Sequence, residues 1–276
     1  MSEVFNFQRF WTYFKYDLKQ MWRNHFKVAL FLGLLPLLLY IIWVLCSLSF
    51  TRNWSAPVLE VRYVFFYLAA LVIVLYQART YGHLTDRQKG SNYLMIPAST
   101  LEKFVSMMLM TLVIIPILFV GVYLLLDGLL SLVDPHYGKT LVSGINDIIA
   151  EVWQADLAGA SFGELFPRGL FIITALISFA QSLVYFLLSG LVFKKWKILG
   201  GLMVSYGFGL VLTVVAGFVV TGEKFRSWVE MLDSGSQVDF AQSFISGSLN
   251  IGLAVSSIFL IALMIGVYYR IKTIKH

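Results

Sequence analysis

Six long apolar runs constrain this chain more than any other feature. A bilayer core of about 30 Å requires about 20 apolar residues in each helix that crosses it. Six segments reach or approach that length, and they span residues 28–50, 61–76, 105–126, 169–193, 198–221 and 249–269. Because 59% of the residues are hydrophobic, the composition is also typical of a polytopic membrane protein. The predicted fold class is therefore an all-α integral membrane protein with six transmembrane helices.

Lys and Arg residues are distributed unevenly between the two sides of these predicted spans. Fifteen of the 21 fall in the first 27 residues, the second and fourth connections and the C-terminal tail. Since cytoplasmic loops of membrane proteins are enriched in Lys and Arg, both termini are predicted to be cytoplasmic, in a multi-pass protein of the inner (cytoplasmic) membrane. The net charge of +6 is explained by this orientation and by anionic headgroups, so no nucleic-acid partner is expected.

Residues 1–27 are predicted to form an amphipathic helix in the membrane interface, ahead of the six-helix domain at residues 28–276. Large apolar side chains recur there at helical spacing: Phe7, Phe10, Trp11, Phe14, Leu18, Met21 and Trp22. The cations fall largely off this stripe, at Arg9, Lys15, Lys19 and Arg23. Such a helix places aromatic residues at the acyl boundary and cations on the headgroups. It is either a simple anchor for the first span or an elbow helix that moves with the bundle.

Two outer connections are predicted to contain short helices that lie on the outer leaflet. The first connection, residues 127–168, has helix-spaced apolar residues at Ile145, Ile148, Ile149, Val152, Trp153 and Leu157. The second, residues 222–248, repeats the pattern at Phe225, Trp228, Val229 and Leu232. These helices form either a solvated cap or an outer gate, and the sequence does not separate the two interpretations.

The fifth run carries small residues at every fourth position: Gly201, Ser205, Gly209, Thr213 and Gly217. Small residues at that spacing let another helix approach closely, either within the subunit, at a subunit interface or along a translocation path. Pro36 and Pro116 are expected to bend the first and third spans. Gln181, in the fourth run, must hydrogen-bond inside the bundle, as a link between helices or as part of a substrate path.

Charged side chains are nearly missing from the six runs. Apart from Arg62 at the outer start of the second run, counted among the outer cations, the runs contain no Asp, Glu, Lys, Arg or His. Ion-coupled carriers need such groups within the membrane, so that class is not expected. Motifs of hydrolases and metal sites are also missing. We therefore predict a chain that is not an enzyme and binds no metal or cofactor, with Asp127 and Asp134 as the only weak catalytic candidate.

The cytoplasmic connection at residues 77–104 is polar but contains an apolar group, Tyr93-Leu94-Met95-Ile96. An exposed apolar group of this kind usually has a surface to dock against. Pro97 disfavours helix at Ile96, while Ser99-Thr-Leu-Glu102 has the pattern of a capping box at the start of the third span. The apolar group and the third span are thus predicted to be separate pieces joined by a stiff corner, so that force on one tilts the other.

This connection resembles the loop between spans two and three of the permease subunits of ATP-binding-cassette exporters with six spans and short cytoplasmic loops. In that family a charged, glycine-containing stretch leads through an apolar segment to Leu-Pro-x-Ser and then a lysine. The corresponding residues here are Asp86-Arg-Gln-Lys-Gly90, Tyr93-Leu-Met-Ile-Pro-Ala-Ser99 and Glu102-Lys103. Ser91-Asn92 replaces the acidic residue often found before the apolar segment. The layout of the whole chain is similar, but the specific residues lie only in this loop.

The resemblance implies a coupling element seated on a separate ATPase subunit and formed by Tyr93, Leu94, Met95, Ile96, Pro97, Ser99, Glu102 and Lys103. It also implies that the partner, and not this chain, binds ATP and Mg²⁺, and that two permease subunits pair as a homodimer or heterodimer among membrane lipids. The expected function is export of a hydrophobic or amphipathic substrate. The alternative is a non-transporting accessory or immunity protein that binds a partner through the same loop.

Overall fold

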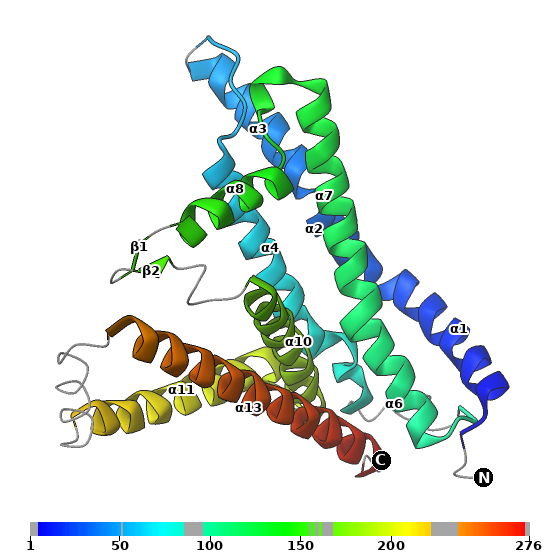
Figure 1. The fold of residues 1–276 in the computed structure, drawn as a ribbon. Coiled ribbons are helices and arrows are strands. Elements are labelled where there is room, and N and C mark those ends of the chain that lie inside the picture. The colour runs from blue at the N-terminus through cyan, green and yellow to red at the C-terminus, as the bar shows by residue number, and fades with distance from the viewer. Residues whose placement is uncertain are drawn as a thin grey trace.

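The computed structural model of this chain describes residues 5–50, 52–85, 96–154, 156–157, 160–161, 168–221 and 237–273. Within these ranges the fold is helical, apart from one antiparallel pair of two-residue strands, β1 (Asp156–Leu157) and β2 (Ala160–Ser161). The helices form an open assembly in which α1 extends along α6, while α11 and α13 diverge from α7 on the other side (Figure 1).

The first 50 residues contain three consecutive helices, α1 (Phe7–Asn24), α2 (Phe26–Gly33) and α3 (Leu35–Phe50). α1 begins at Asn6, whose side-chain oxygen accepts hydrogen bonds from the amides of residues 8 and 9, as is usual for an N-cap. α2 and α3 are bent by 41° relative to each other. The bend lies just before Pro36, which cannot continue the helical hydrogen-bond pattern. The predicted bend at this proline is confirmed.

The predicted second and third spans form the next helices. α4 (Leu59–Thr80) extends past both ends of the second apolar run, residues 61–76, and is followed by the short 3-10 helix η1 (Gly82–Thr85). After the loop, α6 (Thr100–Leu109), the π-helical turn η2 (Met110–Ile114) and α7 (Ile115–Val133) form one continuous helical segment. The π turn lies directly before Pro116, whose ring would clash with the carbonyl four residues earlier in an α-helix. The wider turn accommodates the proline without breaking the segment.

The C-terminal half starts on the predicted outer side with η3 (Pro135–Tyr137) and α8 (Leu141–Gln154). The predicted helix around Ile145 to Trp153 is thus confirmed, whereas Leu157 lies in β1. Three long helices follow: α10 (Arg168–Val192), α11 (Lys197–Thr221) and α13 (Gln237–Thr273). Phe225, Trp228, Val229 and Leu232, the second predicted outer helix, lie outside the described residues.

Several helices have the length and composition of membrane spans. Within the described ranges four segments qualify: Leu59–Thr85, Thr100–Val133, Ile172–Val192 and Gly252–Thr273. The bent pair α2–α3 is a fifth if it counts as one span. The apolar stretch Lys197–Val211 of α11 is shorter. The prediction of a helical chain with multiple membrane-length segments is therefore confirmed. The count of six spans and the side on which the termini lie stay predictions.

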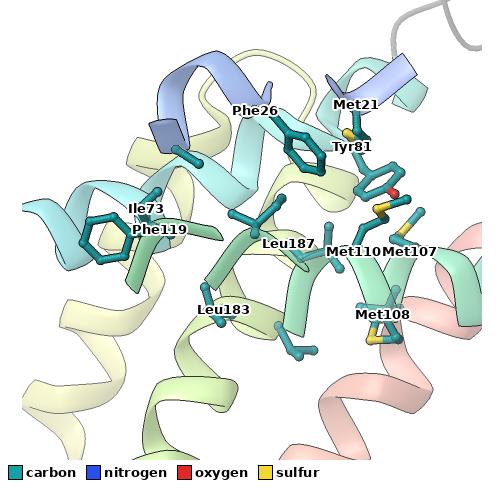
Figure 2. Packing of buried hydrophobic residues seen from close by; sticks show 14 of the residues in the cluster. Met21, Phe26, Ile73, Tyr81, Met107, Met108, Met110, Phe119, Leu183 and Leu187 are labelled. Atoms are coloured by element: carbon teal, nitrogen blue, oxygen red, sulfur yellow. The ribbon is translucent and has the colours of Figure 1, made fainter. Parts of the chain in front are cut away.

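The hydrophobic core lies where α1, α2, α4, α6, α7 and α10 meet. Tyr81, Met107 and Met110 are each 2% exposed or less, and they lie close to Met21 of α1 (Figure 2). α4 and α10 are in close contact at Gly190, where even a methyl group would collide with the backbone of Ala78. We call residues 82–99, which connect α4 to α6, the 82–99 loop. The core therefore joins the N-terminal helix to both sides of this loop and to α10.

A buried ion pair closes the end of the bundle that is predicted to face outward. The Arg62 guanidinium on α4 donates to Asp127 Oδ1 on α7 at 3.0 Å, and both side chains are at most 3% exposed. Asp127 also accepts from the Leu141 amide at 2.7 Å and from the Tyr137 hydroxyl at 2.9 Å. The Tyr137 ring covers the guanidinium at 4.1 Å. Arg62 is thus a core residue that holds η3 and α8 onto α4 and α7, which its assignment to the outer cations did not predict.

We expect the Arg62→Ala substitution to lower the free energy of unfolding by about 3–5 kcal/mol, because it leaves the Asp127 carboxylate buried without its cation. Unfolding of the detergent-solubilised chain would measure this loss. Lys139→Ala is the matched control, since Lys139 and Asp147 form an exposed pair worth at most about 1 kcal/mol. Equal losses in the two variants would show that the Arg62 pair is not a stabilising contact.

Candidate functional site: two carboxylates at the ends of the 82–99 loop

The predicted coupling residues divide into two groups. Tyr93, Leu94 and Met95 lie outside the described residues. Ile96 and Ser99 are half-buried, and Pro97 is exposed. The remaining two predicted residues behave differently, because Glu102 and Lys103 are buried at 0% and 7% exposure. Any surface offered to a partner therefore comes from the first part of this segment, and its last part belongs to the interior of the subunit.

Glu102 fastens the start of α6 to the start of α1. The predicted capping box is present, because the Ser99 amide donates to Glu102 Oε2 at 2.9 Å and the Glu102 amide donates to Ser99 Oγ at 3.2 Å. The same carboxylate accepts from the Asn6 amide at 2.9 Å and forms an ion pair with Arg9 at 2.7 Å. One side chain thus satisfies backbone donors at the beginnings of two helices and neutralises its charge against Arg9.

Asp17 makes a second connection between α1 and its neighbours, about two helical turns after Arg9. Its carboxylate, 6% exposed, accepts from the Tyr81 hydroxyl at 2.8 Å and from the Ser106 hydroxyl at 2.6 Å. Burial raises the pKa of Asp17, and the two hydroxyl hydrogen bonds oppose that rise. Tyr81 precedes the 82–99 loop and Ser106 follows it. Asp17 therefore holds both flanks of the loop against the same face of α1.

The Glu102 and Asp17 contacts make α1 part of the bundle. The N-terminal helix is bonded to α6 at two points separated by about two helical turns, and through Tyr81 to the end of α4. These bonds are compatible with a simple anchor and with an elbow helix, so both interpretations of α1 stay predictions.

Two further contacts connect the same end of the bundle to the C-terminal helices. Lys197 Nζ, at the start of α11, donates to the Gly82 carbonyl in η1 at 2.6 Å. Arg270 on α13 donates to the Leu191 carbonyl at the end of α10 at 2.9 Å. Cations predicted to orient the chain in the membrane thus also hold the turn that begins the 82–99 loop and the end of α10.

His25 occupies the joint between α1 and α2. Its Nδ1 lies 3.0 Å from the Tyr76 hydroxyl, and its ring stacks on His83 of η1 with centroids 6.5 Å apart. Burial lowers the pKa of His25 to about 4, and the nearby His83 adds to this effect. The joint between α1 and α2 is therefore built around a neutral imidazole.

The other predicted site residues lie away from this end. Gln181 donates through Nε2 to the Ser256 carbonyl of α13, which is a link between α10 and α13. In the small-residue row of α11, Gly201 packs on Ser189 and Phe186 of α10. The next three members, Ser205, Gly209 and Thr213, are exposed, while the side-chain surroundings of Gly217 lie outside the description. The row continues past the part of α11 that α10 covers.

The two acids considered as a catalytic candidate have separate partners. Asp127 forms the Arg62 ion pair, while Asp134 accepts from Tyr40, from Trp54 and from the amide and ring of His136. Burial alone would raise the pKa of Asp134, but these hydrogen bonds lower it to about 2. Both carboxylates thus hold together segments at the end of the bundle that is predicted to face outward.

Comparison with protein-family models, with curated proteins and with solved structures gives no match for this chain. The resemblance to exporter permeases therefore depends on the sequence, through the residues of the 77–104 connection and the layout of the apolar runs.

We expect Glu102→Gln to accelerate amide hydrogen exchange over residues 6–17 at least about tenfold, because hydrogen bonds to a charged partner are worth about 1.5–3 kcal/mol. Exchange followed by mass spectrometry would measure the change. Glu60→Gln is the matched control: Glu60 also lies in the first turn of a helix, α4, but is exposed. Unaltered exchange in α1 after Glu102→Gln would contradict the proposed link between α1 and α6.

The His25 joint predicts a pH dependence of stability. The pKa is 6.5 in the unfolded chain and about 4 in the fold, so the unfolded chain binds more protons between these values. Stability is therefore retained above about pH 6.5 and lost as the pH falls towards 4. His25→Gln should flatten this dependence in thermal unfolding between pH 7 and 5, and an unchanged slope would refute the assignment.

Proposed function

We propose that this chain is the membrane permease subunit of an ATP-binding-cassette exporter, which couples ATP hydrolysis on a separate subunit to export of a hydrophobic or amphipathic substrate. The observation that supports this most directly is the way the 82–99 loop is held. Both of its flanks bond to α1, through Asp17 and Glu102. A loop with fixed ends can pass a displacement to the helices that carry it.

The fixed ends favour coupling over a merely connecting loop. Glu102 and Ser106 lie at the start of a helical segment that extends to Val133, and Asp127 lies near its other end. Because neighbouring helices in this segment are packed and hydrogen-bonded, a push on the loop would be transmitted to α1, α4 and α6 together. This is what an energy input from an outside ATPase requires of a chain that resembles an exporter permease.

In the proposed topology α2–α3, α4, α6–α7, α10, α11 and α13 are the six spans, with both termini in the cytoplasm. The ends of α1 and α13 support this arrangement, because both pack against α6 at the same end of the molecule (Figure 1). The Lys and Arg bias then places this end, with the 82–99 loop, in the cytoplasm.

A second permease subunit is part of the proposal. Ser205, Gly209 and Thr213 of α11 are exposed in the single subunit, and small residues at this spacing favour close helix pairing in a membrane. We propose that this face of α11 contacts a second subunit, as a homodimer or heterodimer, and that ATP and Mg²⁺ are bound by the partner ATPase. Gln181 is retained as a candidate residue of the substrate path.

Replacing Tyr93 and Leu94 together by Asp should abolish co-purification of this chain with its cognate ATPase, because two charges would replace the apolar group that we propose to be seated on that subunit. Affinity capture of the complex from detergent-solubilised membranes would measure the loss.

The matched control is the double variant Val142→Asp and Ile148→Asp, which adds the same charge to exposed apolar positions of α8 on the opposite side of the proposed topology. It should leave capture intact. If the Tyr93 and Leu94 variant is captured as well as the control, or if no ATPase associates with the native chain, the proposed function is wrong.

A further inference from the structure

The exposed surface of α1 is divided into distinct sectors. Since successive residues of an α-helix are rotated by about 100°, residues spaced by three, four or seven share a face. Phe10, Tyr13, Asp17 and Met21 form the face that packs on the bundle, and each is at most 6% exposed. The predicted aromatic stripe is therefore split, because Phe10 and Met21 turn inward while others of its members do not.

Beside the buried face lies an aromatic sector. Phe7, Trp11 and Trp22 are 68%, 47% and 58% exposed, and they fall on one flank of the helix by the same spacing. Trp11 stacks on the half-buried Phe14, and Trp22 packs edge-on against Phe26 at the start of α2. This sector therefore continues directly into the helix pair α2–α3 that we propose as the first span.

Beyond the aromatic sector lies a cationic one. Lys15, Lys19 and Arg23 are exposed at successive turns, and the Lys15 ammonium lies 5.5 Å from the Trp11 ring. Asp17 is the only acid in α1, and it is buried against Tyr81 and Ser106. The exposed surface of α1 thus presents three cations with no acid between them. An exposed ion-paired helix would normally show both signs of charge.

We propose that this exposed surface of α1 binds the anionic phospholipid headgroups of the membrane, with the aromatic sector at the acyl boundary and the cationic sector on the phosphates. The order of the sectors around the helix carries this assignment. Around α1 the buried face is followed by the aromatic sector and then by the cationic sector. A helix that lies in a membrane interface meets its surroundings in the matching order: the protein, the acyl boundary and the headgroups. An acidic protein partner would match the cations but would leave the three large aromatic side chains unexplained.

Asp17 adds no negative charge to this surface. By the same spacing it lies on the opposite side of α1 from Lys15, Lys19 and Arg23, and Tyr81 and Ser106 hold it inside. The proposal requires only that the chain lies in a membrane; it does not depend on an ATPase or on transport.

The test compares lipid binding by the full-length chain in detergent, titrated with phosphatidylglycerol or phosphatidylcholine carrying the same acyl chains and followed by native mass spectrometry. The native chain should bind phosphatidylglycerol in preference. The variant Lys15→Gln, Lys19→Gln and Arg23→Gln should reduce that preference about fivefold or more, since one cation near an anionic surface already contributes about that factor.

The matched control is Lys194→Gln, Lys195→Gln and Lys272→Gln, which removes three exposed cations from the same proposed side and should keep most of the preference. An equal loss in both variants, or none in the α1 variant, would overturn the proposal. Replacement of Trp11 and Trp22 by Phe provides a second measurement. It should remove most of the fluorescence quenching by phospholipids brominated on their acyl chains, and unchanged quenching would contradict the placement of the aromatic sector.

Discussion

Polar groups that leave water must find partners inside the protein. In this structure four carboxylates are the acceptors for donors that lie on segments far apart in the sequence. Glu102 joins the first turns of α1 and α6, and Asp17 joins α1 to both flanks of the 82–99 loop. Asp127 and Asp134 do the same for segments at the other end of the bundle. Each of these acids accepts from two or more donors, so its loss would break several contacts at once.

The apolar periodicity and the local signals of the sequence predicted much of the fold. The capping box at Ser99, the bend before Pro36 and the helix around Ile148 depend on neighbouring residues, so they could be predicted from the order of residues alone. The long-range pairs could not, because Arg9 with Glu102 and Arg62 with Asp127 are far apart in the chain. Arg62 was therefore counted among the outer cations, although burial with an acid partner lets it lie in the core.

One signal for the candidate site was present in the sequence and was not used. Asp17 lies seven residues after Phe10 and four before Met21, so it belongs to the apolar face of α1. An acid in such a position needs buried donors, and Tyr81 and Ser106 provide them. Which hydroxyls would do so depends on how α1, α4 and α6 cross, and that information is not local. The predicted coupling residues Glu102 and Lys103 illustrate the same limit: their position after the loop was clear, and their burial was not.

The π turn at Met110–Ile114 sets the angular relation between the two ends of the segment from Thr100 to Val133. A π turn contains one residue more than an α turn, so everything after it is rotated by about 100° relative to an uninterrupted α-helix. Glu102 and Ser106 face α1 before this turn, and Asp127 faces Arg62 after it. The extra residue therefore changes which neighbour the polar side chains after the turn face. A helical wheel drawn without it would assign one end of the segment to the wrong face.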